Sequence, residues 1–235
     1  QSSWTPDADV VKHILPGSKY HESFKEQLDR VADFFNSIIR EDGTTIPFIF
    51  RPWHEMDGTW FWWGSQQCSP EDFQKLFAFT VSYLRDEKGI DNMLIAYSPD
   101  RNFHSADQYL TWYPGDAFVD ILGVDNYHDL KQENGHLEAI KKLHIVIAES
   151  KKRDKLSAFT ETGLENVTDS AWYPKKLGAV LSDSLVQKGI SYVMVWRNDP
   201  KVHFFFPYPG HPGADGAKEL LERENIFLLS EYNAA

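Results

Sequence analysis

Five short apolar runs, with helical patterns around them, constrain the fold of this chain more than any other feature. Most of the runs are apolar at every position, which is typical of parallel strands that are buried on both faces. Elsewhere apolar residues recur every three or four positions, and Ser69, Pro70, Glu71 and Asp72 indicate a helix start. The predicted strands are residues 46–50, 93–97, 121–126, 157–160 and 192–196, and the predicted helices lie within 24–38, 73–84, 137–147 and 177–185.

This alternation of strand and helix, without a linker or a change of composition, predicts a single parallel α/β domain over residues 1–235. No glycine-rich phosphate-binding motif follows a strand, which disfavours an open nucleotide-binding sheet. In a (β/α)8 barrel the functional residues follow the carboxyl ends of the strands. The polar residues that do so here are Arg51, His54, Glu55, Ser98, Asp100, Tyr127, His128, Asp129, Glu161, Arg197, Asn198 and Asp199.

The length of the chain does not suffice for a closed barrel. The chain has 235 residues, and its predicted strands start 28 to 47 residues apart. At the mean spacing, eight βα units would need about 292 residues. We therefore expect a (β/α)8 barrel whose first three βα units are absent from this chain, because five parallel strands alone would expose two edges.

The charge of the chain disfavours two classes of partner. It contains 24 Lys and Arg against 35 Asp and Glu, a net charge of −11. Without a basic cluster, nucleic acid and anionic membrane surfaces are not expected partners. No run reaches the roughly 20 apolar residues of a membrane span. The single cysteine, Cys68, precedes a predicted helix and is expected to be unreactive.

Neither a metal nor a cofactor is expected. His54-Glu55 begins like the zinc motif H-E-x-x-H, but position 58 is glycine. Residues 125–129, Asp-Asn-Tyr-His-Asp, leave three interpretations open. They could hold a cation, form a hydrogen-bonded strand end, or supply a tyrosine that orients a nucleophile.

Two glutamates, Glu55 and Glu161, follow the first and fourth predicted strands. Glycosidic cleavage needs such a pair, one carboxyl group to protonate the leaving oxygen and one to attack or to activate water. Beside Glu55 stand four consecutive aromatic residues, 60–63, which neither a helix nor a strand can bury completely. We expect Trp60 to line a cleft, where its ring suits the apolar face of a sugar. Phe61 and one further tryptophan are expected to pack in the interior.

Residues 51–64, RPWHEMDGTWFWWG, resemble the signature of glycoside hydrolase family 26, which is best known for β-mannanases. Residues 96–100, 123–127, 159–163 and 195–198 resemble later strand ends of that family in the same order. The resemblance covers nearly the whole chain and implies that it contains barrel strands four to eight. The family's first three strands, which supply a Trp-His sugar contact, have no counterpart before residue 1.

The resemblance also implies a role for each matching residue. Glu55 would be the acid/base and Glu161 the nucleophile. Three residues would orient these carboxylates, and two tryptophans would stack on the sugars on either side of the cleaved bond. The orienting residues are Arg51, His54 and Tyr127, and the stacking residues are Trp60 and Trp196.

The sequence therefore predicts a retaining endo-β-1,4-mannanase that acts on mannan-type hemicellulose or manno-oligosaccharides by double displacement. The resemblance also admits a mixed-linkage β-glucanase or a β-xylanase. A non-catalytic carbohydrate-binding barrel is a further alternative, although such a protein has no need of both glutamates. We expect a monomer that is secreted, periplasmic or on the cell surface.

Overall fold

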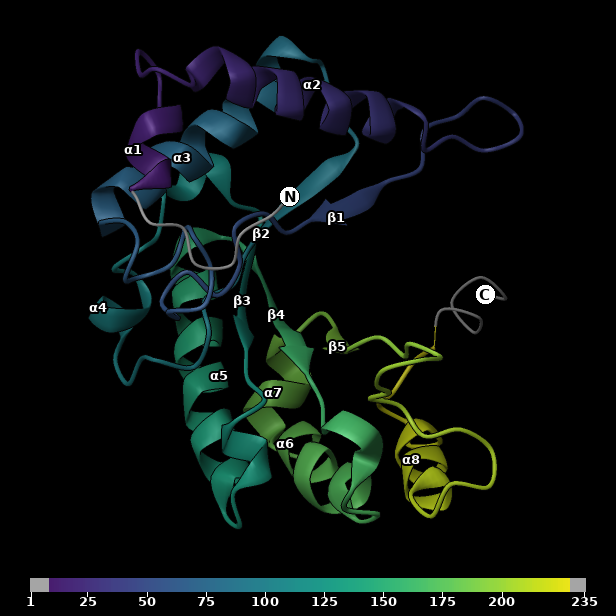
Figure 1. Ribbon diagram of the computed structural model, residues 1–235. Coiled ribbons are helices and arrows are strands. Elements are labelled where there is room, and N and C mark those ends of the chain that lie inside the picture. Colours follow the sequence, from purple (N-terminus) through teal and green to yellow (C-terminus); the bar gives the residue numbers. More distant parts are fainter. Residues whose placement is uncertain (1–8, 229–235) are drawn as a thin grey trace. The chain divides into compact units, whose positions relative to one another are not determined.

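The computed structural model describes residues 9–228, in which strands and helices alternate (Figure 1). The strands are β1 (Phe48–Phe50), β2 (Met93–Tyr97), β3 (Ile121–Asp125), β4 (Leu156–Thr162) and β5 (Val193–Val195). The α-helices are α1 (Val10–Ile14), α2 (His21–Asn36), α3 (Pro70–Ser82), α4 (Ala106–Tyr109), α5 (Gly135–Arg153), α6 (Gly178–Leu181), α7 (Ser184–Gly189) and α8 (Ala214–Leu221). Shorter helical turns of the π and 3-10 types are η1 (Tyr83–Glu87), η2 (Asp116–Phe118), η3 (Asp129–Lys131), η4 (Glu165–Val167) and η5 (Trp172–Leu177).

All five predicted strands are present, and they follow one another in chain order, β1-β2-β3-β4-β5. Parallel pairing joins β1 to β2, β2 to β3, and β4 to β5. Every residue of β3 is buried, as are most residues of β2 and β4. The expectation of burial on both faces is wrong for β1, where Ile49 is exposed. The two terminal strands of this order have only one partner strand among the described residues.

The helix predicted behind Ser69 begins as expected. The Ser69 side chain accepts a hydrogen bond from the backbone N–H of Asp72, and Pro70 is the first helical residue. The single helix predicted within 177–185 is wrong, because the chain there forms α6 and α7 with a break at Asp183. The Asp183 carboxylate caps α7 by accepting bonds from the N–H groups of Leu185 and Val186. Because Asp183 caps a new helix that begins at Ser184, α6 ends before it, at Leu181.

The structure forms two compact units. Unit 1 consists of Gln1–Gly123 and Glu149–Leu156. Its core is built on α3, which buries Phe73, Leu76, Phe77 and Val81 completely, the apolar face predicted from the helical spacing. The α2 helix packs against β1, with the Phe35 ring 4.5 Å from that of Phe48.

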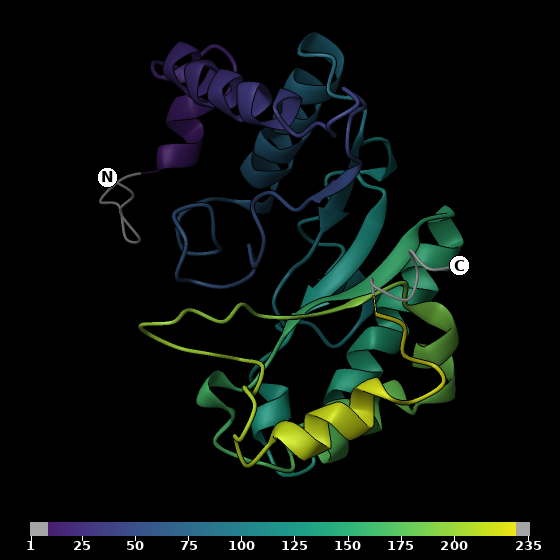
Figure 2. The ribbon, with the colours of Figure 1, turned by 90° about the vertical axis from the view of Figure 1, so that its right-hand side faces the viewer.

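Unit 2 consists of Val124–Ala148 and Ser157–Ala235. Its core contains Phe159 of β4, Leu143 of α5 and Val180 of α6, all fully buried. The last helix, α8, drawn in yellow in Figure 2, packs against η5. Leu137, an apolar position of the helix predicted within 137–147, is exposed. Among residues 9–228 no helix is long and apolar enough to cross a membrane.

Candidate active site

The chain bends sharply where β1 ends, and Glu55 lies in that bend. Trp53 and Glu55 have φ angles of +53° and +54°. Non-glycine residues rarely adopt this left-handed region, at a cost of order 1–3 kcal/mol, and they persist only where the surroundings enforce it. Such strain is concentrated at functional sites. The bend therefore marks Glu55 by an observation that is independent of its sequence motif.

Trp60 contacts Glu55 directly. Its indole Nε1–H donates a hydrogen bond of 2.7 Å to Glu55 Oε2, while 38% of the tryptophan stays exposed. The other three aromatic residues of the run are partly buried and pack on one another. Phe61 stacks on Trp63 with the ring planes 10° apart, and Trp62 meets Trp63 edge-on. Trp60 is thus the most exposed residue of the run and Phe61 packs against its neighbours, while the cleft expected at Trp60 stays a prediction.

Arg51 and His54 lie beside Glu55 in unit 1. Arg51 Nη1 donates to the Ser98 hydroxyl at 3.1 Å, and the Glu55 N–H donates to the Ser98 carbonyl at 2.8 Å. Burial, and next the positive charge of Arg51, lower the pKa of His54 to about 3. His54 is therefore neutral at every pH at which the protein would work. It offers the site a hydrogen-bonding imidazole without a charge.

Glu161 lies at the carboxyl end of β4 in unit 2 and is 5% exposed. The Tyr127 hydroxyl donates to Glu161 Oε1 at 2.6 Å. The backbone holds the same two strand ends together, because the Asn126 N–H donates to the Glu161 carbonyl at 2.9 Å. Of the predicted orienting residues, Tyr127 thus contacts its expected carboxylate.

The strand end after β3 is held by a buried ion pair. Lys142 Nζ of α5 lies 2.5 Å from Asp129 Oδ2, and both side chains are nearly inaccessible. Asn126 Nδ2 donates to the same oxygen at 2.9 Å. An ammonium group thus occupies the position that a cation would need. The structure favours the other two interpretations, which are compatible: a hydrogen-bonded strand end and a tyrosine that contacts Glu161. Sequence patterns gave no signal for Lys142.

Phe205 packs behind Tyr127. The two rings are 5.7 Å apart, and the Phe205 carbonyl accepts a hydrogen bond from the Tyr173 hydroxyl. Phe205 also covers Gly163, which has φ +148° and where an added Cβ would lie 2.6 Å from the phenylalanine ring. Sequence reasoning missed Phe205, although the aromatic run at 204–206 was a visible signal.

Trp196 is half-buried, and its backbone N–H donates to the Thr162 carbonyl at 3.0 Å, one residue after Glu161. Its role as a sugar platform stays a prediction. Cys68 behaves as expected: it donates to the Trp63 carbonyl, and burial raises its pKa to about 12, so the thiol stays protonated. Among residues 9–228 no cluster of three or more His, Cys, Asp or Glu is arranged to hold a metal.

Asp57, like Lys142 and Phe205, was not predicted from the sequence. Its carboxylate is half-buried and accepts hydrogen bonds from the backbone N–H groups of Asp100 and Asn102. Burial, and next the charge of Asp100, raise the pKa of Asp57 to about 7. Asp57 lies within the signature segment, residues 51–64. The sequence pattern did not indicate that its carboxylate would bind the backbone of Asp100 and Asn102.

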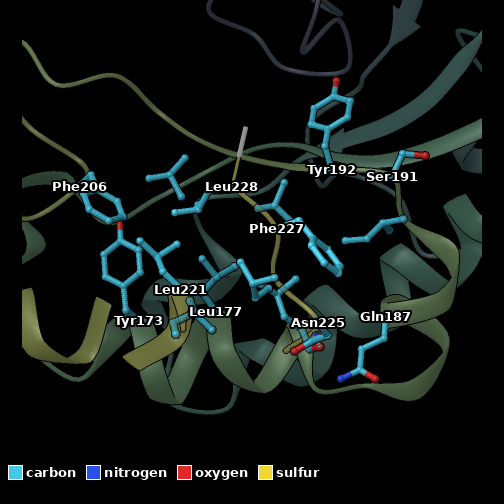
Figure 3. Close-up of a pocket in the computed structure, with 16 residues that line it drawn as sticks. Tyr173, Leu177, Gln187, Ser191, Tyr192, Phe206, Leu221, Asn225, Phe227 and Leu228 are labelled. Carbon is cyan, nitrogen blue, oxygen red and sulfur yellow. Dashed lines mark hydrogen bonds between the residues drawn. The ribbon is translucent and has the colours of Figure 1, made fainter. Parts of the chain in front are cut away.

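An apolar cavity of about 470 Å³ lies in unit 2, apart from the predicted site residues (Figure 3). Its walls come from η5, β5, α8 and the chain that follows α8, with Tyr173, Phe206 and Leu228 among them. Among residues 9–228, no carboxylate, imidazole or basic side chain lines it.

Comparison with known proteins identifies the family of the chain. The model of glycosyl hydrolase family 26 matches residues 2–163. The chain belongs to this family. Among curated relatives it is 36% identical over 201 residues to a mannan endo-1,4-beta-mannosidase of Bifidobacterium adolescentis, a match that covers 80% of this chain and 20% of the relative. A mannan endo-1,4-beta-mannosidase of Bacillus subtilis is 31% identical over 182 residues, 73% of this chain and 45% of the relative.

Solved structures of the family confirm the fold class. A GH26 beta-mannanase from Bacteroides ovatus matches with a TM-score of 0.90 and 38% identity, over 97% of this chain and 65% of that chain. GH26C from Muricauda sp. matches with a TM-score of 0.88 and 37% identity, over 94% and 60%. This family 26 chain is thus an α/β fold of five parallel strands, consistent with a truncated (β/α)8 barrel. It spans less than two thirds of these relatives' lengths.

Proposed function

We propose that the complete protein containing this chain is a retaining endo-β-1,4-mannanase that cleaves mannan-type hemicellulose by double displacement. The observation that carries the proposal is the setting of the two glutamates. Glu55 lies in the chain that follows β1 and Glu161 at the carboxyl end of β4, and each accepts a hydrogen bond from an aromatic donor, Glu55 from Trp60 and Glu161 from Tyr127. Family membership and the names of the curated relatives support the choice of reaction and sugar.

In the first step of the proposed reaction, the ionised Glu161 carboxylate attacks the anomeric carbon of a mannosyl unit. The bond from that carbon to the glycosidic oxygen breaks, and Glu55 gives its proton to the departing oxygen. The product is a glycosyl ester on Glu161 and a shortened mannan chain. The Tyr127 hydroxyl, which donates to Glu161 Oε1, holds one oxygen of the nucleophile in place.

In the second step, the Glu55 carboxylate takes a proton from water, and the water oxygen displaces Glu161 from the anomeric carbon. Two inversions at one carbon return the original configuration, and both glutamates regain their starting protonation states. Trp60 fixes one oxygen of Glu55 in both steps through its N–H group. Because His54 is neutral, it places no charge beside Glu55 during either proton transfer.

The exposed face of Trp60 offers a platform on which a sugar ring can stack next to Glu55. Trp196, which follows β5, is the corresponding platform proposed for the region of Glu161. A stacked ring that binds substrate and transition state equally affects mainly KM. Mixed-linkage β-glucan and xylan remain rival substrates, since the same two carboxylates would serve any of these β-linked sugars.

We further propose that the protein acts as a monomer outside the cytoplasm, whether secreted, periplasmic or held at the cell surface. A polysaccharide substrate supports this location, because a polymer of this kind does not cross a membrane before it is cut. Fractionation of the source cells, with activity measured in each fraction, tests the location. Sedimentation of the purified protein tests the oligomeric state.

The test of the activity is the release of reducing sugar from mannan, lichenan and xylan by the complete polypeptide. The proposal predicts release from mannan that exceeds release from the other two by at least about tenfold. Glu161→Ala should lose this activity, while Glu219→Ala, on the exposed face of α8 in the same unit, should keep it. Activity on lichenan or xylan alone would refute the assignment of the sugar.

A further inference from the structure

The strained backbone at Glu55 needs an anchor on each side to hold its conformation. With φ at +54°, this residue would relax into the ordinary β or α region if its neighbours were released. On its amino side, the Glu55 N–H donates to the Ser98 carbonyl at 2.8 Å. That single bond fixes one flank of the residue. On its carboxyl side, the residue that fixes the backbone is Asp57.

Asp57 supplies this second anchor. Its Oδ1 accepts a bond of 2.6 Å from the Asp100 N–H, and its Oδ2 accepts one of 3.1 Å from the Asn102 N–H. Both oxygens of the Asp57 carboxylate thus bind the segment that follows β2. The same segment binds Glu55 through the Ser98 carbonyl. Because all of these groups lie within unit 1, the anchor does not depend on unit 2.

From this geometry we propose that Asp57 is a positioning residue for the acid/base Glu55. It ties residues 55–58 to residues 98–102 and so holds the Glu55 carboxyl group where it can pass its proton to the leaving oxygen. The inference rests on the proposed function for the role of Glu55. The Gly58 N–H, which donates to the Glu55 carbonyl at 3.0 Å, shows how closely the backbone from Glu55 to Asp57 is folded.

This role has a signature that a merely structural residue would not show. A residue that acts by positioning the acid Glu55 affects the first chemical step only when the leaving group needs a proton. Loss of the Asp57 anchor should therefore slow cleavage of a sugar–sugar bond and spare cleavage of a bond to a good leaving group. General loss of folded protein would lower both rates by the same factor.

The experiment compares Asp57→Asn with wild type in the complete polypeptide. Asparagine keeps the size of the side chain, but its NH2 group cannot accept the second amide bond. We expect kcat/KM on mannotetraose to fall about 10- to 100-fold, since small displacements of catalytic groups cost this much. On 2,4-dinitrophenyl β-mannobioside, kcat/KM should stay within about threefold of wild type.

Asp42→Asn is the matched control. The Asp42 carboxylate also accepts two hydrogen bonds, both from Thr44, but in an exposed turn between α2 and β1. This variant should keep both rates. Amide hydrogen exchange gives an independent readout: exchange at Asp100 and Asn102 should accelerate in Asp57→Asn and stay unchanged in Asp42→Asn.

The outcomes separate this inference from the proposed function. Equal losses on both substrates in Asp57→Asn, or no loss on either, would overturn the positioning role while leaving the mannanase assignment intact. If wild type cleaves lichenan or xylan instead of mannan, the same comparison is made with the dinitrophenyl glycoside of that sugar, and the same split supports the role. A wild-type protein that cleaves no glycoside would overturn both.

Discussion

At the scale of single residues, the two glutamates have the same side chain but different neighbours. Glu55 lies in a strained bend beside an exposed tryptophan, whereas Glu161 is buried at the carboxyl end of β4 and bonded to a tyrosine hydroxyl. A carboxyl group that gives and takes a proton needs access to substrate and water, and a nucleophile needs a fixed position. The two settings therefore match the two roles proposed.

The roles predict distinct losses in two alanine variants. Glu161→Ala should lose turnover on every substrate by at least about 10³-fold, because no nucleophile remains. Glu55→Ala should lose cleavage of mannan but spare the first step with a dinitrophenyl mannoside, and azide should rescue the second step. Steady-state rates with and without azide check this. Azide rescue confined to Glu161→Ala, with an inverted product, would show that the two roles are exchanged.

Gly163 gives a prediction about stability. Alanine there meets two obstacles, a φ of +148° and the ring of Phe205 at 2.6 Å from the new Cβ. Gly210 has a φ of +88° with nothing within 4 Å of the added atom, so Gly210→Ala isolates the backbone strain. We expect Gly163→Ala to lower the free energy of unfolding by about 1–3 kcal/mol more than Gly210→Ala, the usual cost of overpacking. Urea titration measures both, and equal losses would mean that Phe205 moves aside without cost.

At the scale of secondary-structure elements, local signals were sufficient wherever a few neighbouring residues decide the structure. The start of α3 and the outward position of Trp60 follow from adjacent residues, and both were predicted. The break between α6 and α7 depends on whether Asp183 caps a new helix or stays within one, which periodicity alone does not settle. Lys142 and Phe205 reach partners 13 and 78 residues away, and no local pattern identifies such partners.

The ion pair between α5 and the end of β3 is predicted to matter more than surface pairs on the same helix. Lys142→Met would remove the ammonium group from the buried Asp129 carboxylate, and the loss of one partner of a buried ion pair costs about 3–5 kcal/mol. Lys141, one residue earlier, pairs with Glu138 in solvent, and Lys141→Met should cost less than about 1 kcal/mol. Urea unfolding of the two variants tests the difference. Similar losses would show that Asp129 finds another partner or water.

At the scale of the whole molecule, two half-buried groups, His54 and Asp57, make opposite contributions to the pH dependence of unfolding. The pKa of His54 is lowered to about 3, so the unfolded chain binds more protons and stability rises with pH up to the unfolded value near 6.5. The pKa of Asp57 is raised to about 7 from 3.8, so the folded chain binds more protons and stability falls with pH between these values. From about pH 4 to 6.5 the two slopes oppose each other.

Replacing either residue should reveal the pH dependence of stability that the other contributes. Between pH 4.5 and 6.5, Asp57→Asn should make stability rise more steeply with pH than in wild type, and His54→Gln should make it rise less or fall. Each change in slope should approach one proton, about 1.4 kcal/mol per pH unit. Urea titrations at several pH values supply the slopes. Parallel pH profiles for wild type and both variants would contradict the two shifted pKa values.

The central claim, that Glu161 forms a covalent bond to the sugar during catalysis, has one direct test. An activated 2-deoxy-2-fluoro-β-mannoside should react once with the complete protein and then stall, because the fluorine slows both steps while the good leaving group lets the first proceed. Intact mass should increase by one fluorosugar, and peptide mapping should place it on Glu161. An adduct on Glu55, or no adduct from a protein that releases product of inverted configuration, would contradict the account.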